Sequence, residues 1–133
     1  MLRAAICDDE SVILSMMKSS IEKTFLQEKF DCSIQAFSSG EELLKIHKDQ
    51  PYDVLFLDIY MTGYSGFDVA KTVGKLTPNT LLIFVTSQDS MVYNSLDYRP
   101  FQFVRKNRIQ TDNSELVTVT RKLIKYYREH KSI

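Results

Sequence analysis

Short apolar segments alternate with segments of helical period along the whole chain. In 11–28, apolar residues recur every three or four positions, which predicts an amphipathic helix. The runs 54–57 and 81–85 are continuously apolar, and such runs are typical of strands that are covered on both faces. Further strands are predicted at 3–7, 32–37 and 101–104, and further helices at 38–50, 67–73, 90–96 and 113–127.

Polar residues mark where several of these helices begin and end. Ser38 is followed three positions later by Glu41, which predicts a capping box at the start of the second helix. Pro51 ends that helix, because proline lacks the N–H that a helix interior needs. Asp112 or Asn113 is expected to cap the last helix.

The strands and helices therefore alternate five times, which is typical of an α/β protein with a parallel sheet and helices on both faces. Five strands of this length fit a flavodoxin-like doubly wound (βα)5 sandwich with strand order 2-1-3-4-5. The sequence shows no linker, repeat or low-complexity stretch, so we expect a single domain over residues 1–133.

Composition and charge exclude several classes of protein. The 17 basic and 17 acidic residues cancel, which argues against nucleic-acid binding by bulk electrostatics. No apolar run reaches the roughly 18–20 residues of a membrane span, and the N-terminus does not resemble a secretory signal. Two cysteines do not make a disulfide scaffold, so we expect a reduced, cytoplasmic setting without membrane contact.

The charges are nevertheless unevenly distributed. Residues 1–68 carry 12 acids and 6 bases, whereas residues 99–133 carry 3 acids and 9 bases. A sign split between the two ends of one chain indicates either a functional site or simply a solvated basic helix.

Polar residues follow the predicted strands at the points where a doubly wound sheet places its functional crevice. Asp8 and Asp9 follow the first strand, Asp58 the third, Thr86 the fourth and Lys106 the fifth. Three carboxylates that meet in one crevice repel one another unless a cation joins them, and Mg²⁺ prefers such oxygen ligands. A carboxylate can also act as a nucleophile toward phosphorus, while a lysine and a hydroxyl stabilise the phosphoryl oxygens.

These residues resemble the receiver domains of two-component response regulators over essentially the whole chain. The motifs are Ile6-Cys7-Asp8-Asp9-Glu10, Leu57-Asp58-Ile59-Tyr60-Met61, Gly66, Val85-Thr86-Ser87 and Val104-Arg105-Lys106. The resemblance implies that Asp58 is the phosphoacceptor and that Asp8, Asp9, Asp58 and the Tyr60 carbonyl hold Mg²⁺. It also implies that Thr86 is the switch hydroxyl, Lys106 the partner of the phosphoryl charge and Phe103 the aromatic switch residue.

Two positions depart from the family's usual pattern. Thr62 and Asn107 stand where the family usually has prolines, four residues after the phosphoacceptor and directly after the lysine. In the family the second proline follows a cis peptide bond, but a cis bond before a non-proline residue costs about 3–4 kcal/mol. We therefore expect the Lys106–Asn107 peptide to be trans.

The stretch from Arg99 to Lys106 is similar to receivers that are attached to LytTR-type DNA-binding domains. The resemblance implies that a sensor histidine kinase phosphorylates Asp58 and that the fourth helix, fifth strand and fifth helix then repack. In the family this face commonly forms symmetric homodimers. In this chain it is expected to carry Arg121, Lys122, Lys125, Arg128 and the pair Tyr126-Tyr127, although a plain solvated helix fits these residues as well. DNA is expected to bind only through a domain absent from this chain.

The same residues argue against two other classes of protein. A phosphatase of the haloacid dehalogenase type wants a second aspartate two positions after the nucleophile, where this chain has Tyr60. A flavin carrier needs a phosphate-binding loop after the first strand, where Asp8-Asp9-Glu10 repels phosphate. Two alternatives stay open, namely a pseudo-receiver that binds without being phosphorylated and a stand-alone phosphorelay receiver.

Two further residue types complete the expectations from the sequence. His47 and His130 are expected on helix surfaces, where nothing pairs them as metal ligands. Cys7 is expected to be a small buried apolar residue of the first strand.

Overall fold

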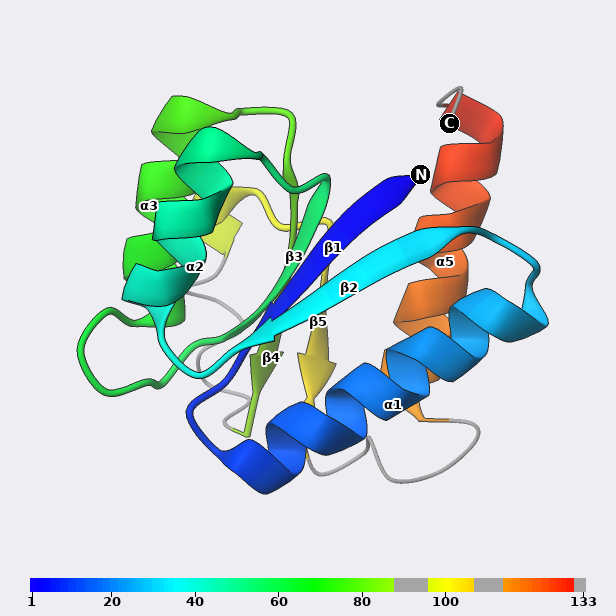
Figure 1. Cartoon of the computed structure of the whole chain (residues 1–133), viewed down its shortest axis with the longest axis horizontal. Coiled ribbons are helices and arrows are strands. Elements are labelled where there is room, and N and C mark those ends of the chain that lie inside the picture. The colour runs from blue at the N-terminus through cyan, green and yellow to red at the C-terminus, as the bar shows by residue number, and fades with distance from the viewer. Residues whose placement is uncertain (88–95, 107–113, 131–133) are drawn as a thin grey trace.

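The computed structural model describes residues 1–87, 96–106 and 114–130, in which strands and helices alternate (Figure 1). The strands are β1 (Leu2–Cys7), β2 (Cys32–Phe37), β3 (Val54–Asp58), β4 (Leu81–Thr86) and β5 (Gln102–Arg105). The helices are α1 (Ser11–Gln27), α2 (Gly40–Asp49), α3 (Gly66–Leu76), the 3₁₀ helix η1 (Leu96–Tyr98) and α5 (Glu115–His130).

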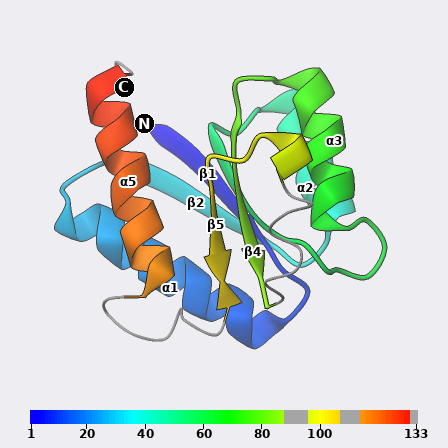
Figure 2. The same cartoon turned by 180° about the vertical axis from the view of Figure 1, so that it is seen from behind.

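The strands form one parallel sheet of order β2-β1-β3-β4-β5, which confirms the predicted flavodoxin-like topology. Helices α1 and α5 cover one face of the sheet, and α2 and α3 cover the other (Figures 1 and 2). The strand order reverses between β1 and β3, so the crevice of this fold is expected at their carboxyl ends.

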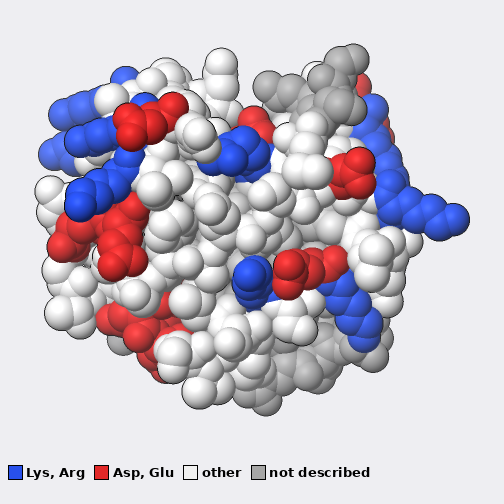
Figure 3. Space-filling view, in the orientation of Figure 1, with Lys and Arg blue, Asp and Glu red and all other residues white. Residues whose placement is uncertain are grey.

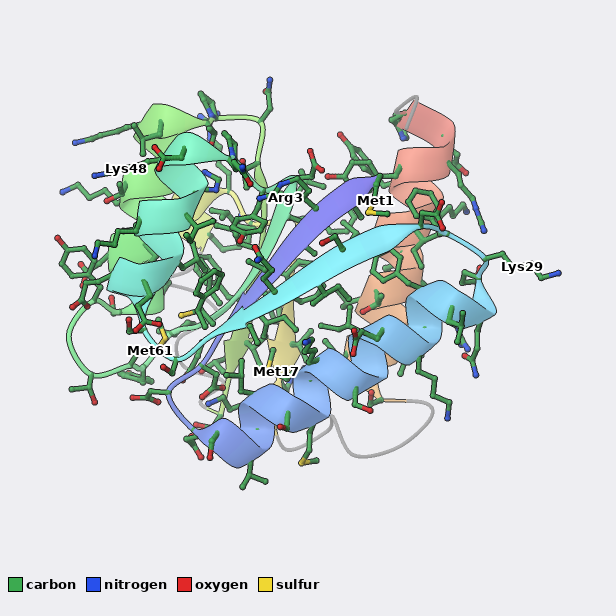
Figure 4. All side chains as sticks on the ribbon, in the orientation of Figure 1. Met1, Arg3, Met17, Lys29, Lys48 and Met61 are labelled. Atoms are coloured by element: carbon green, nitrogen blue, oxygen red, sulfur yellow. The ribbon has the colours of Figure 1, made fainter. Side chains whose placement is uncertain are left out.

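The core lies in two layers because successive side chains of a strand point to opposite faces of the sheet. Ile6 and Phe56 pack with α1 and α5, and Met17 lies between α1 and the sheet (Figure 4). Ala5 and Leu55, their neighbours along the strands, pack with α2 and α3. All of β3 is buried, which confirms the prediction of a strand covered on both faces.

The predicted cap of α2 is wrong by one residue. Ser39, not Ser38, occupies the N-cap, where its hydroxyl accepts a hydrogen bond from the Glu42 N–H at 3.2 Å. Two adjacent serines precede this helix, and either one can act as the cap locally. Gly40 directly follows the cap and packs so closely that a Cβ there would lie 2.6 Å from a methyl carbon of Val69.

Several expectations concern residues outside the described ranges. The helix predicted at 90–96 falls almost entirely on such residues, and Leu96 itself begins the 3₁₀ helix η1. Asp112, Asn113 and the Lys106–Asn107 peptide also lie outside them. The described residue Ser114 precedes α5 and accepts a hydrogen bond from the Val117 N–H at 3.3 Å, which is the bond of an N-cap. The cap therefore lies one residue beyond the positions predicted for it.

The expectation that His47 lies on a helix surface is also wrong, because its side chain is completely buried. It faces α3 and the residues that lead into β3, since Thr77 and Tyr52 both hydrogen-bond to it. His130 is exposed, as expected, and Cys7 is buried in β1, as expected.

The charges of α2 are arranged along its axis. Glu41 and Glu42 lie in its first turn, and Lys48 lies in its last turn. Figure 3 shows basic side chains at the upper left, over the ends of α2 and α3, and acidic ones below them. This order opposes the helix macrodipole at both ends and stabilises the helix. Among the described residues, no helix is both long and apolar enough to cross a membrane.

Candidate functional site

The five polar residues predicted at strand ends lie along one edge of the sheet. Asp8 and Asp9 directly follow β1, Asp58 and Thr86 are the last residues of β3 and β4, and Lys106 directly follows β5. Because all five strands are parallel, their carboxyl ends share this edge. Met61 lies at the same edge, in the connection after β3 (Figure 4).

The three aspartates form a compact acidic cluster. One carboxylate oxygen from each of Asp8, Asp9 and Asp58 lies within 4.8 Å of the other two. Asp8 and Asp58 are buried, whereas Asp9 is exposed. The cluster therefore has a dry inner side and an open outer side.

Lys106 spans the cluster from β5. Its Nζ lies 2.9 Å from Asp8 Oδ2, 3.0 Å from Asp58 Oδ2 and 3.2 Å from Glu10 Oε1. Burial disfavours the charged ammonium, but the hydrogen bonds to Asp8 and Asp58 outweigh it and raise the pKa of Lys106. The lysine is therefore charged at any physiological pH.

The Asp58 carboxyl is harder to ionise than an ordinary aspartate. Burial and the neighbouring charge of Asp8 raise its pKa to about 6, although Lys106 and a backbone hydrogen bond from Tyr60 oppose the rise. At neutral pH most of the population is still the carboxylate, which is the nucleophilic form.

The arrangement of charges suits a hard divalent cation. Lys106 is the one ammonium that pairs with Asp8, Asp58 and Glu10 in the described part of the chain, and Asp9 adds a further carboxylate beside them. Apart from Lys106, the buried Oδ2 atoms of Asp8 and Asp58 have no hydrogen-bond partner in the described part of the chain. Oxygen ligands with uncompensated negative charge are what Mg²⁺ prefers, so the residues present fit this ion.

The other expected site residues lie on β4, in the loop after β3 and on β5. Thr86 is buried at the end of β4, and β4 pairs with β3 so that Val85 lies opposite Asp58. Tyr60 is half exposed in the loop after β3. Phe103 is half-buried on β5 and borders a cavity of about 270 Å³ between β5 and α5. The metal and switch roles of these residues remain predictions.

Three residues that contact the site were not predicted to do so. Glu10 binds Lys106, Thr62 donates hydrogen bonds to Asp9, and a side chain at Gly66 would collide with the carbonyl oxygen of Asp58. Glu10 continues the acidic run after β1, and Thr62 puts a donor where the family usually has proline. The sequence held no other signal for the contact between Glu10 and Lys106 or for the contact between Thr62 and Asp9.

Comparisons with known proteins agree with this geometry. The family described as "Response regulator receiver domain" matches residues 4–121. The sensory transduction protein LytT of Bacillus subtilis is 25% identical over 128 residues, which cover 93% of this chain and 52% of that protein.

Similar solved structures include two with the same fold and a sequence identity of at least 25%. The REC domain of AraT, a response regulator from Geobacillus stearothermophilus, matches with a TM-score of 0.78 and 25% identity, covering 98% of both chains. The response regulator TrrA from Thermotoga maritima, solved in complex with Mg(2+)-BeF, matches with a TM-score of 0.73 and 27% identity, covering 94% of this chain and 98% of that one.

The chain spans about half the length of the curated relatives that it matches. The family match, in contrast, covers the strands and helices described above except the first two residues of β1 and the part of α5 after Arg121. The chain belongs to the response regulator receiver domains, the signalling domains of two-component systems.

Proposed function

We propose that this receiver domain accepts a phosphoryl group on Asp58 from a sensor histidine kinase. The observation that carries the proposal is the meeting of buried Asp58 with Asp8, Asp9 and Lys106 at one edge of the sheet. In the reaction, an Asp58 carboxylate oxygen attacks phosphorus and forms an O–P bond, while the P–N bond to the kinase histidine breaks. The released imidazole nitrogen takes the electron pair of that bond.

The residues around Asp58 are suited to the charge of this transfer. Lys106 already lies 3.0 Å from Asp58 Oδ2, so its ammonium is in place for a phosphoryl oxygen without a large movement. Mg²⁺, held by Asp8, Asp9, Asp58 and the Tyr60 carbonyl, would supply further positive charge there. The complex of TrrA with Mg(2+)-BeF supports this assignment by similarity.

The phosphoryl group is proposed to act as a conformational signal. It adds a charge of about −1.5 to −2 beside Thr86 and Lys106 and shifts an existing equilibrium between two states. Thr86 then moves toward the phosphoryl group, and Phe103 turns inward from its half-buried position next to the cavity between β5 and α5.

The face around α5 is the proposed surface of a phosphorylation-dependent homodimer. Arg121, Lys122, Lys125 and Arg128 are exposed on α5, as this proposal needs. Tyr127 does not belong to that face, contrary to the expectation from the sequence. It is buried, and its hydroxyl donates a hydrogen bond to the Asp53 carbonyl at 3.2 Å.

The full protein is proposed to be a cytoplasmic LytTR-type transcription regulator, because its relatives include LytT and are about twice as long. DNA binding and the choice of target genes are assigned to the part outside this chain. A stand-alone phosphorelay receiver is the alternative, and the length of the native protein distinguishes the two.

Phosphorylation can be tested with acetyl phosphate and Mg²⁺, followed by intact-mass measurement. We expect one added phosphoryl mass on the wild type and none on Asp58→Asn. Asp49→Asn is the matched control, because Asp49 is an exposed aspartate at the end of α2, and it should label like the wild type. Unlabelled wild type, or labelled Asp58→Asn, would contradict the proposal and favour a pseudo-receiver.

A further inference from the structure

Asp9 is held differently from the other carboxylates of the cluster. Lys106 contacts Asp8, Asp58 and Glu10, whereas Asp9 forms no ion pair within the described part of the chain. Its Oδ2 accepts two hydrogen bonds from Thr62, one from the backbone N–H at 3.0 Å and one from the hydroxyl Oγ1 at 3.3 Å.

Asp9 needs such a restraint because of its position. It is exposed, and its carboxylate lies close to those of Asp8 and Asp58, which repel it. An exposed aspartate that nothing holds would turn toward solvent, where the repulsion is weaker. Hydrogen bonds to an ionised acceptor are stronger than those between neutral groups, so the pair from Thr62 can oppose this movement.

The loop that carries Thr62 is held in place without help from Asp9. The Tyr64 N–H donates to Glu41 Oε1 at 3.3 Å, which ties the loop to α2. Ser65 and Asp68 form a reciprocal capping box at the start of α3, with bonds of 2.9 and 3.1 Å. These contacts anchor the residues two and three positions after Thr62, so the loop has anchors other than Asp9 and can present Thr62 as a donor to it.

We propose that Thr62 is a positioning residue for the cation site. It keeps Asp9 beside Asp8 and Asp58 before a cation arrives, so that the ion meets an assembled set of oxygen ligands. Both hydrogen bonds fall on Oδ2, which leaves Asp9 Oδ1 for the ion or one of its water ligands. This inference rests on the proposed Mg²⁺ site and adds to it a residue that orients one ligand from outside.

Substitutions of Thr62 can remove its two hydrogen bonds to Asp9 separately. Valine keeps the N–H and the shape of threonine but removes the hydroxyl, and serine keeps both donors. Proline removes both donors, since it has no N–H. Thr72→Val is the matched control, because Thr72 lies on α3 and its hydroxyl bonds to the Asp68 carbonyl instead of the acidic cluster.

The test is a calorimetric Mg²⁺ titration of the metal-free chain. We expect Thr62→Val to bind Mg²⁺ several-fold more weakly than the wild type, and Thr62→Ser and Thr72→Val to bind like it. Thr62→Pro should lose about tenfold, the low end of the 10- to 100-fold effect of outer-shell partners, because Asp9 is exposed. The rise of the melting temperature with Mg²⁺ should follow the same order.

Two results would overturn the role of Thr62, and they differ in what else they contradict. Wild-type affinity or tighter binding in both Thr62→Val and Thr62→Pro would contradict the positioning role alone, and the Mg²⁺ site would stand. A wild-type chain that binds no Mg²⁺ would contradict the cation site as well as the role of Thr62.

Discussion

At the scale of single residues, His47 is a polar group that the fold has buried and fully paired. Its Nδ1 accepts a hydrogen bond from the Tyr52 N–H at 3.1 Å, so the ring hydrogen sits on Nε2, which donates to Thr77 Oγ1 at 2.7 Å. Thr80 extends this network, because its hydroxyl lies 2.9 Å from Thr77 Oγ1. The network joins α2, the end of α3 and the approaches to β3 and β4.

The network predicts a pH-dependent stability. Burial and the nearby charge of Arg3 lower the pKa of His47 below 6.5, its ordinary value. Below that pH the unfolded chain therefore binds more protons than the folded one, and the free energy of unfolding falls as the pH falls. We expect urea unfolding at several pH values to show this loss.

Two substitutions isolate the contribution of His47, since other groups also titrate in this range. His47→Gln should be less stable near neutral pH but should lose less stability than the wild type on acidification below pH 6.5. His130→Gln changes an exposed histidine and should keep the wild-type slope. Equal slopes in all three proteins would show that His47 does not cause the pH dependence.

The sequence pattern could not predict the places of His47 and Thr62. The hydrophobic period places α2 correctly, but the buried His47 bonds to Thr77, which lies 30 positions away in the chain, as well as to the nearby Tyr52 N–H. Thr62 reaches Asp9 across 53 positions of the chain, which no local rule detects. Asp8, Asp58 and Lys106 could be predicted to meet because each directly follows an apolar strand, and the ends of parallel strands share one edge.

At the scale of elements, α3 contains two glycines in opposite surroundings. Gly66 begins the helix, and a side chain there would collide with the carbonyl oxygen of Asp58. Gly74 lies in the same helix, and nothing stands within 4 Å of where its Cβ would be. The first glycine lets α3 begin against the end of β3, whereas the second only weakens the helix.

Alanine at these two positions should therefore change stability in opposite directions. Gly74→Ala is expected to raise the free energy of unfolding by about 0.5–1 kcal/mol, because alanine loses less backbone entropy in a helix. Gly66→Ala is expected to lower it by about 1–3 kcal/mol, the usual cost of overpacking, and to slow phosphorylation of the displaced Asp58. Urea unfolding and intact-mass kinetics measure the two effects, and destabilisation by both alanines would contradict this account.

The predicted bounds of strands and helices differ slightly from those in the structure. Strand β2 lies at the predicted residues, β4 ends one residue later than predicted, and β5 begins and ends one residue later than predicted. The caps of α2 and α5 each lie one residue beyond the predicted serine or Asx position. Several polar residues precede both helices, and each is of a type that can accept the cap hydrogen bond, so local rules do not select one of them.

At the scale of the whole molecule, the proposed dimer predicts a change of mass in solution. Beryllofluoride and Mg²⁺ mimic the phosphoryl group, so sedimentation should shift from one chain toward two at high protein concentration. Lys122→Glu changes the charge of the proposed face beside the Phe103 cavity and should weaken this shift. Lys48→Glu makes the same change at the end of α2 and should leave it intact. An unchanged mass with the mimic would count against this dimer.

Helix α5 runs away from the edge of the sheet that carries Asp58. The helix begins at Glu115, close to the carboxyl ends of the strands, and its 16 residues rise about 24 Å to His130. There it lies near the N-terminus (Figure 1), and Arg128 pairs with Glu28, the residue after α1, at 3.2 Å. The two ends of α5 therefore lie at different distances from Asp58, with Glu115 near it and His130 far from it. A change at Asp58 can reach the His130 end of the domain through the packing of α5 on the sheet.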